Sequence, residues 1–202
     1  MNICKKMNYD LYIRDCIKES IKTKSGLFSK IKEIQTIVDS IVNCYHHDGK
    51  ILICGNGGSA ADSQHFATEL VNEYKIRGRP ALSALALSMD IVQSTAWAND
   101  HGNSAEFGFA RQVEAYAKSG DILLGISTSG NAGNVYRAFE KGKQRGTVNI
   151  ALTGKGGGKI KSLADLCFEV PSNDTPRVQE AHELTYHIIC DLVEKELFGP
   201  GY

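Results

Sequence analysis

Two short segments rich in glycine and hydroxyl side chains are the clearest candidates for chemistry in this sequence. They read Gly55-Asn56-Gly57-Gly58-Ser59 and Ser127-Thr128-Ser129-Gly130-Asn131. Small residues let backbone N–H groups approach an anion, and hydroxyls add donors without bulk. Each segment alone could be an ordinary tight turn with a helix cap. Two such segments favour a phosphorylated ligand, and neither contains the lysine of a Walker A nucleotide site.

A histidine and a carboxylate follow the first segment. His65 and Glu69 are four residues apart, so they share one face of a predicted helix. This pair could bind a divalent metal, act as acid and base, or form an ordinary intrahelical contact. Asp62 could be a second base, although an acid in the first turn of a helix, favoured by the helix dipole, is the simpler interpretation.

A predicted C-terminal helix, residues 178–197, carries further candidates. Glu183 and His187 are four residues apart, whereas Gln179 and His187 are separated by ~12 Å along an unbroken helix. One ion could take both as ligands only if long side chains converged, if Gln179 lay before the helix, or if the two came from different subunits. We expect His182 to be a surface or core histidine.

A third group of polar residues, Asn99-Asp100-His101, ends another predicted helix. Asn99 and Asp100 could cap or turn the chain, or bind sugar hydroxyls. The glycine-rich stretch 154–159 resembles a Walker A loop only superficially, because no serine or threonine follows Lys159. We interpret it as a flexible turn.

The elements that must position these residues alternate along the chain. Short apolar runs predict buried parallel strands at 50–54, 83–87, 121–127, 147–153 and 166–170. Helical spacing predicts helices at 9–22, 27–45, 60–71, 90–98, 105–118, 134–144, 159–164 and 178–197. This pattern predicts a single α/β domain over residues 1–202 with right-handed crossovers, and ligands bound beyond the carboxyl ends of the strands. Residues 1–48 are expected to form an added helical layer that makes subunit contacts.

Composition narrows the functional classes. The 202 residues include 23 basic and 23 acidic side chains, so the formal net charge of zero gives no overall attraction to nucleic acid or to anionic membranes. We see no membrane span and no signal peptide, and therefore expect a cytoplasmic protein. The six cysteines are scattered, which favours buried reduced thiols over disulfides or a thiolate zinc site.

Four segments in this order resemble the phosphoheptose isomerases of the sugar isomerase (SIS) domain superfamily. They are CGNGGSAADSQHFATEL (residues 54–70), AND (98–100), GISTSGN (125–131) and RVQEAH (177–182). The resemblance covers nearly the whole chain. It implies a three-layer α/β/α sandwich with a five-stranded parallel sheet in flavodoxin-like order, and a homotetramer with active sites at subunit interfaces.

The resemblance also implies an activity. It is the conversion of sedoheptulose 7-phosphate to D-glycero-D-manno-heptose 7-phosphate through an enediol, the first step toward nucleotide-activated heptose for lipopolysaccharide, capsule or other glycans. Matched by motif, the zinc site would be His65, Glu69, Gln179 and His187. The acid/base pair would be Glu69 and His187. The substrate-binding residues would be Asn56, Gly57, Gly58, Ser59, Glu69, Asn99, Asp100, Ser127, Thr128, Ser129 and Gln179.

One residue departs from the family pattern. The phosphate loop of the family ends in serine, and Ala132 stands there in this chain, so one hydroxyl is missing. Some relatives with this fold bind partner proteins, as the DnaA initiator-associating protein does, or sense sugar phosphates. The complete set of four predicted zinc ligands favours the enzyme over these alternatives.

Overall fold

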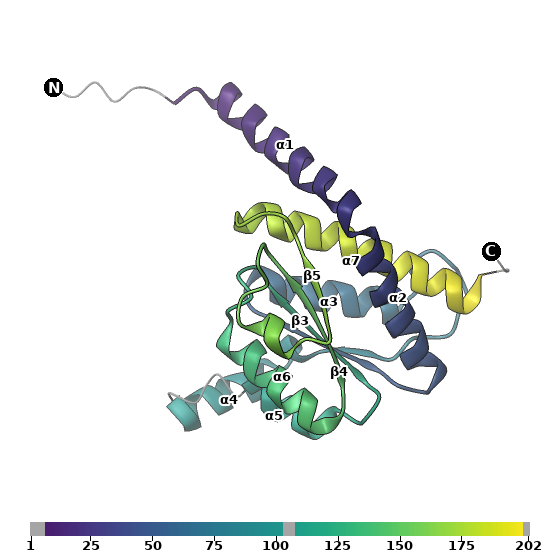
Figure 1. The fold of residues 1–202 in the computed structure, drawn as a ribbon. Helices are drawn as coiled ribbons and strands as arrows, with labels where there is room; N and C mark the ends of the chain where they lie inside the picture. Colours follow the sequence, from purple (N-terminus) through teal and green to yellow (C-terminus); the bar gives the residue numbers. More distant parts are fainter. Residues whose placement is uncertain (1–6, 103–107, 200–202) are drawn as a thin grey trace.

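A parallel sheet lies at the centre of the computed structural model, which describes residues 7–102 and 108–199 (Figure 1). The sheet has five strands in the order β2-β1-β3-β4-β5. Their bounds are β1 (Ile51–Gly55), β2 (Ala84–Ala86), β3 (Ile122–Ser127), β4 (Val148–Thr153) and β5 (Leu166–Glu169). The flavodoxin-like order expected from the sequence is confirmed, and every predicted strand is present within one or two residues.

Helices precede, connect and follow the strands. They are α1 (Tyr9–Gly26), α2 (Ile31–His46), α3 (Gly58–Val71), α4 (Ile91–His101), α5 (Gly108–Tyr116), α6 (Gly133–Arg145) and α7 (Thr175–Phe198). Two predicted helical stretches are partly or wholly 3-10 turns, Leu27–Lys30 and Ile160–Leu163. The first residues of the predicted helix 105–118, like residues 1–6 with Cys4, lie outside the described residues.

The inner strands β1, β3 and β4 contribute alternate side chains to two apolar layers. On one face, Ile51 and Ile53 pack with the buried residues of α2, α3 and α7. On the other face, Leu52 and Cys54 pack with α5 and α6. A strand with a period of two that is buried on both faces must be apolar throughout, which explains the uninterrupted runs in the sequence. The three-layer sandwich predicted from the sequence is therefore confirmed.

The strand order reverses between β1 and β3. These two strands pair in register, with Gly55 beside Ile126, so the two glycine-rich segments leave the sheet side by side. In an open parallel sheet the crevice at such a switch point is the usual place for a ligand. The topology therefore brings together the two segments that the sequence predicts to be anion-binding sites.

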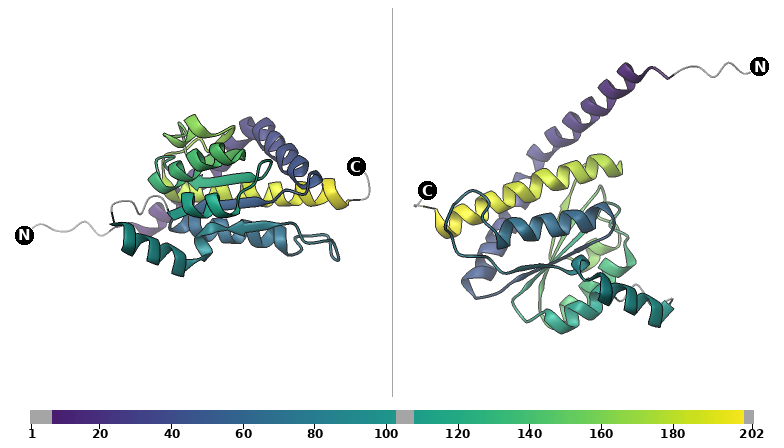
Figure 2. Two further views of the ribbon diagram at one scale, coloured as in Figure 1. Left: turned by 90° about the horizontal axis from the view of Figure 1, so that it is seen from below. Right: turned by 180° about the vertical axis from the view of Figure 1, so that it is seen from behind.

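The two N-terminal helices differ in how they pack. α2 buries Ile34, Ile37 and Ile41 in the apolar layer shared with α7. α1 projects beyond the body of the molecule (Figures 1 and 2) and leaves Ile13, Ile17 and other large apolar side chains more than half exposed. Only the first of these helices therefore has an apolar face that the chain does not cover.

The cysteines and the glycine-rich turn complete the comparison with the sequence. The five cysteines in the described residues are free, three of them buried and two half-buried. No helix in the described ranges is long and apolar enough to cross a membrane. The stretch 154–159, predicted to be a flexible turn, is instead hydrogen-bonded to the loop after β3 through Gly154 N–H to Thr128 O and Ile160 N–H to Gly130 O.

Candidate active site

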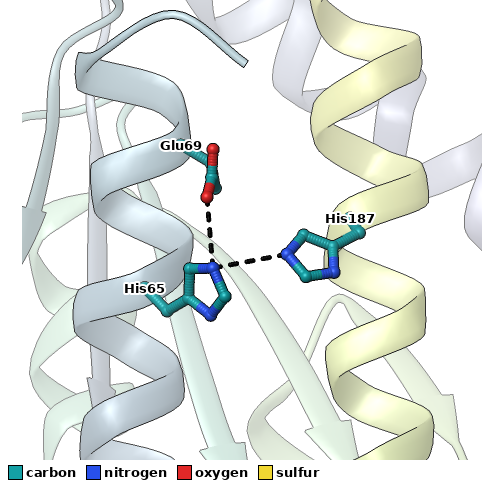
Figure 3. Close-up of side chains that lie close together, drawn as sticks. All are labelled: His65, Glu69 and His187. Atoms are coloured by element: carbon teal, nitrogen blue, oxygen red, sulfur yellow. Dashed lines mark hydrogen bonds and ion pairs between the residues drawn. The ribbon is translucent and has the colours of Figure 1, made fainter. Parts of the chain in front are cut away.

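α3 and α7 run side by side and together position the candidate catalytic residues (Figure 3). Residues about 120 positions apart in sequence meet along this seam, which we call the α3–α7 seam. Tyr186 on α7 contacts His65 on α3, and Glu194 farther along α7 contacts the backbone of Tyr74 just after α3. The two helices are far apart along the chain: α3 follows the first strand, β1, and α7 follows the last strand, β5.

A cluster of His65, Glu69 and His187 lies in the middle of the seam (Figure 3). His65 Nε2 is 3.1 Å from Glu69 Oε1 and 3.4 Å from His187 Nε2. One candidate ligand atom from each residue lies within 4.8 Å of the others. Two imidazoles and a carboxylate form a donor set that fits zinc and leaves a coordination position open. The structure thus brings together three of the four predicted ligands within one chain.

Aromatic rings border the cluster. The Tyr186 hydroxyl is 2.9 Å from His65 Nδ1, and the Tyr74 ring stacks on His187 with ring centroids 5.8 Å apart. Burial raises the pKa of Tyr186, so its phenol stays protonated at neutral pH. The cluster therefore has one wall of rings, and the His65 side chain keeps 42% of its surface exposed.

A carboxylate pair lies between the cluster and the first glycine-rich loop. Burial, followed by the charge of Glu183, raises the pKa of Asp62 to about 6. Because α3 begins at Gly58, its first turn contains no acidic residue. The interpretation of Asp62 as a first-turn acid is therefore wrong: Asp62 faces α7 and not the helix terminus.

Gln179 lies within α7, which is unbroken from Thr175 to Phe198. The alternative in which Gln179 precedes the helix is therefore wrong. Its amide packs against the start of α3, where a Cβ at Gly58 would collide with it. About two helical turns separate Gln179 from His187, so Gln179 lies at the glycine-rich loop of its own chain. His182, by contrast, is fully buried and faces Thr153 O in the core.

The two glycine-rich loops are joined by a pair of asparagines. Asn56 and Asn134 exchange two side-chain hydrogen bonds of 2.7 and 2.8 Å. Asn134 comes from the first turn of α6, and sequence reasoning did not identify it. Its only sequence signal was its place at the start of a predicted helix. The pair fixes the separation of the two loops and occupies the amide of Asn56.

The loop after β3 is polar and open. Ser127 is buried, Thr128 is half-buried, and Ser129 is exposed. A cavity of about 460 Å³ is lined by Thr128, Ser129, Asn131, Lys155, Gly156, Gly158 and Asn173. Lys155, on the docked glycine-rich turn, is a second residue that the sequence did not single out. Ala132 occupies the N-cap of α6 and provides no side-chain hydrogen bond there.

Asn99 and Asp100 do not join the cluster in this chain. They lie near the end of α4, which projects from the body away from α7 (Figures 1 and 2), and both are exposed. Asn99 donates a hydrogen bond of 3.0 Å to Asp100. His101 stacks on Trp97 with ring centroids 3.8 Å apart. These residues are therefore exposed and lie apart from the α3–α7 seam of their own chain.

A buried ion pair closes the far end of the seam. Arg79 and Glu194 are both almost fully buried, and Arg79 also donates a hydrogen bond of 2.9 Å to the carbonyl of Glu69. Burial alone would raise the pKa of Glu194, but the Arg79 guanidinium and the backbone N–H groups of residues 74–76 lower it. The pair therefore ties the end of α3, with Glu69, to α7.

Known proteins resemble this chain over most of its length. The SIS domain family model matches residues 15–154. Phosphoheptose isomerase from Clostridium acetobutylicum is 48% identical over 191 residues, covering 93% of this chain and 96% of that protein. A Helicobacter pylori phosphoheptose isomerase is 49% identical over 88% of this chain and 93% of its own length.

Solved structures give the same result. The structure of phosphoheptose isomerase from Neisseria gonorrhoeae superposes with a TM-score of 0.87 at 38% identity, covering 93% of this chain and all of that chain. The phosphoheptose isomerase from Francisella tularensis gives 0.89 at 34% identity, covering 94% of this chain and all of its own. The chain therefore belongs to the SIS domain family and, within it, to the phosphoheptose isomerases.

Proposed function

We propose that this protein isomerises sedoheptulose 7-phosphate to D-glycero-D-manno-heptose 7-phosphate. The observation that carries the proposal is the cluster of His65, Glu69 and His187, whose first two members lie on the helix that begins at the first of two neighbouring glycine-rich loops. Relatives that are 48–49% identical to this chain are named phosphoheptose isomerases. A sensor or partner-binding role is the other candidate. The Vibrio vulnificus NanR protein, solved in complex with ManNAc-6P, matches this chain at 15% identity, a likeness that shows the fold alone.

The reaction moves a proton between C1 and C2 of the sugar through an enediol. Glu69 is the proposed base, because Oε1 faces His65 and Oε2 has no hydrogen bond among the described residues. His187 is the proposed partner that exchanges a proton with the other carbon or oxygen. A zinc ion held by His65, Glu69 and His187 would polarise the carbonyl and hydroxyl oxygens. Gln179 would complete the ligand set from a neighbouring subunit.

The phosphate is proposed to bind at the switch point of the sheet. Ser127, Thr128 and Ser129 offer hydroxyls, and the loop 55–59 offers backbone N–H groups at the start of α3. The N-cap residues of α3 and α6 make no side-chain cap. Because the Ser59 and Ala60 N–H groups already donate to the carbonyls of Asn56 and Gly57, we assign the anion to the N–H groups of Gly57 and Gly58. These groups bind the end of the sugar that does not react.

Subunit contacts would complete the site. The exposed apolar side chains of α1 favour burial against other copies, which is why we propose that the helical layer within residues 1–48 forms a homotetramer. Asn99 and Asp100 would then reach the substrate of a neighbouring chain. Light scattering at micromolar concentration should give the mass of a tetramer, whereas a monomer would contradict the interfacial site.

The activity test uses purified protein with sedoheptulose 7-phosphate in deuterated water. We expect an aldose product that carries deuterium at C2, provided the base exchanges its proton with solvent. The wild-type protein should also retain near-stoichiometric zinc after mild dialysis. Binding of the sugar phosphate without turnover, in zinc-loaded protein, would favour the sensor role. We propose a cytoplasmic location and a place at the start of heptose activation for surface glycans, which a neighbouring heptose kinase gene would support.

A further inference from the structure

Both ring nitrogens of His65 have partners, which is unusual for an exposed histidine. Nε2 faces Glu69 and His187, and Nδ1 lies 2.9 Å from the Tyr186 hydroxyl. A neutral imidazole carries one proton, and a metal ligand must present a lone pair. If Nε2 binds a metal, Nδ1 must be the protonated nitrogen, and it then needs an acceptor. The Tyr186 oxygen is the acceptor that the structure provides.

A hydroxyl suits both states of this histidine. With no ion in the cluster, Nε2–H can donate to Glu69 while Nδ1 accepts the phenolic proton. With an ion on Nε2, Nδ1–H donates to the phenol oxygen instead. A carboxylate or a carbonyl at the same place could only accept, and would match the second state alone. The phenol therefore keeps the His65 ring in one orientation through loading and release.

The hydroxyl is held firmly because the Tyr186 ring belongs to the core. Tyr186 and Phe66 are both fully buried, and their rings stack with centroids 5.3 Å apart. The ring also contacts His65 and His187 edge-on, at 5.4 and 4.9 Å.

We propose that Tyr186 is a positioning residue of the metal site, which sets the Nδ1–H form of His65 so that Nε2 faces the ion. This inference rests on the zinc site of the proposed function. It assigns no contact between Tyr186 and the substrate. The hydroxyl should therefore affect metal binding strongly and the turnover of fully loaded protein weakly.

The test compares Tyr186→Phe with wild type by competition with a chromophoric zinc chelator. The substitution removes one oxygen and keeps the stacked ring. We expect zinc affinity to fall by about 10- to 100-fold, as for other partners of metal-binding histidines. At saturating zinc, kcat should stay within a few-fold of wild type. Tyr45→Phe is the matched control, because the Tyr45 phenol donates to Ser83 O at 3.4 Å and not to His65, and this variant should bind zinc as wild type does.

Two further measurements separate the possible failures. If His65→Ala loses zinc and Tyr186→Phe keeps wild-type affinity, the role of Tyr186 is overturned and the zinc site stands. If His65→Ala and His187→Ala both retain full zinc, the site itself is wrong. Nitrogen-15 NMR of zinc-loaded wild-type protein should show His65 protonated at Nδ1. This Nδ1 proton should exchange with solvent faster in Tyr186→Phe. Zinc bound at Nδ1 would also overturn the proposal.

Discussion

The α3–α7 seam and the end of α4 carry predicted site residues of similar types, but only the seam assembles them. In the seam, Tyr186 and His187 on α7 meet His65 on α3 through contacts of 2.9 and 3.4 Å. At the end of α4, Asn99 donates to its neighbour Asp100. None of the described side chains of α4 is buried, whereas α3 and α7 each bury a full apolar face. One chain thus brings His65, Glu69 and His187 together by itself, and we propose that the polar residues of α4 serve a neighbouring copy.

The largest expected effect is at the assembled part. Glu69→Gln keeps the shape and one oxygen of the side chain but removes its basicity. A general base contributes about 10²–10⁴ in rate, so kcat should fall by at least the lower end of that range. Turnover of sedoheptulose 7-phosphate measures it, with folding and mass checked by circular dichroism and light scattering.

His187→Ala should show a loss of the same order. Glu73→Gln is a control that should turn over normally: Glu73 is half-buried just beyond α3, and glutamine keeps an oxygen that can accept the hydrogen bond from Gly78 N–H. If folded Glu69→Gln and His187→Ala both work within a few-fold of wild type, the proton transfer lies elsewhere. Asp62 and His101 would then be the next candidates.

The second expected effect separates two histidines of α7. Burial lowers the pKa of His182 to about 4 in the folded protein, against an ordinary value near 6.5. At pH values between these two, the unfolded chain therefore binds a proton at His182 that the folded chain does not bind. The free energy of unfolding should fall, by on the order of 3 kcal/mol in full, as the pH drops from about 6.5 to 4.

His182→Gln keeps a donor toward Thr153 O and should remove that part of the pH dependence, measured by urea unfolding at several pH values. His46→Gln, at an exposed histidine, is the control and should leave the slope unchanged. An identical slope in His182→Gln and wild type would show that His182 does not titrate as its burial implies.

The third effect tests whether α4 serves another chain. Asp100→Ala should lose the roughly 1.5–3 kcal/mol of a hydrogen bond to a charged group, and so about 10- to 100-fold in kcat/KM. Mixed oligomers of Glu69→Gln and Asp100→Ala subunits should regain part of the wild-type activity, because some sites then combine an intact Glu69 with an intact Asp100. Mixed oligomers no more active than their parents would mean that both residues act within one chain.

The smallest effect is expected in the phosphate loop. Ala132→Ser restores the hydroxyl found in the family pattern and should lower KM by the ~0.5–1.5 kcal/mol of one net hydrogen bond, or about 2- to 10-fold. As a control, sedoheptulose without its phosphate should inhibit Ala132→Ser and the wild type equally weakly. An unchanged or higher KM would show that neighbouring groups, such as those lining the cavity beside Lys155, already compensate.

Local patterns were enough to predict the elements of this fold. Apolar runs such as 121–127 predict buried strands because both faces of the sheet are covered, and the spacing of His65 and Glu69 already places them on one helix face. The contacts along the seam could not be predicted this way. Tyr186 follows its helix pattern as a core residue, and no spacing within α7 indicates that its hydroxyl meets His65.

The prediction of a flexible turn at 154–159 was wrong for a different reason. Glycines are typical of flexible segments, but here they allow close approach, since a Cβ at Gly130 would collide with the carbonyl of Gly157. The projection of α1 from the body of the molecule could not be predicted from the sequence either. An amphipathic helix has the same pattern whether its apolar face packs on its own sheet or on another chain.

The position of α7 in the chain has a consequence for biosynthesis. All five strands lie before residue 170, so a nascent chain can form its sheet while α7 is still within the ribosome. Until α7 docks, however, one apolar layer lacks a helix, and His65 and Glu69 have neither Tyr186 nor His187 beside them. A chain cut short before Thr175 would leave part of one apolar layer exposed, and it would lack His187, the α7 member of the proposed zinc site.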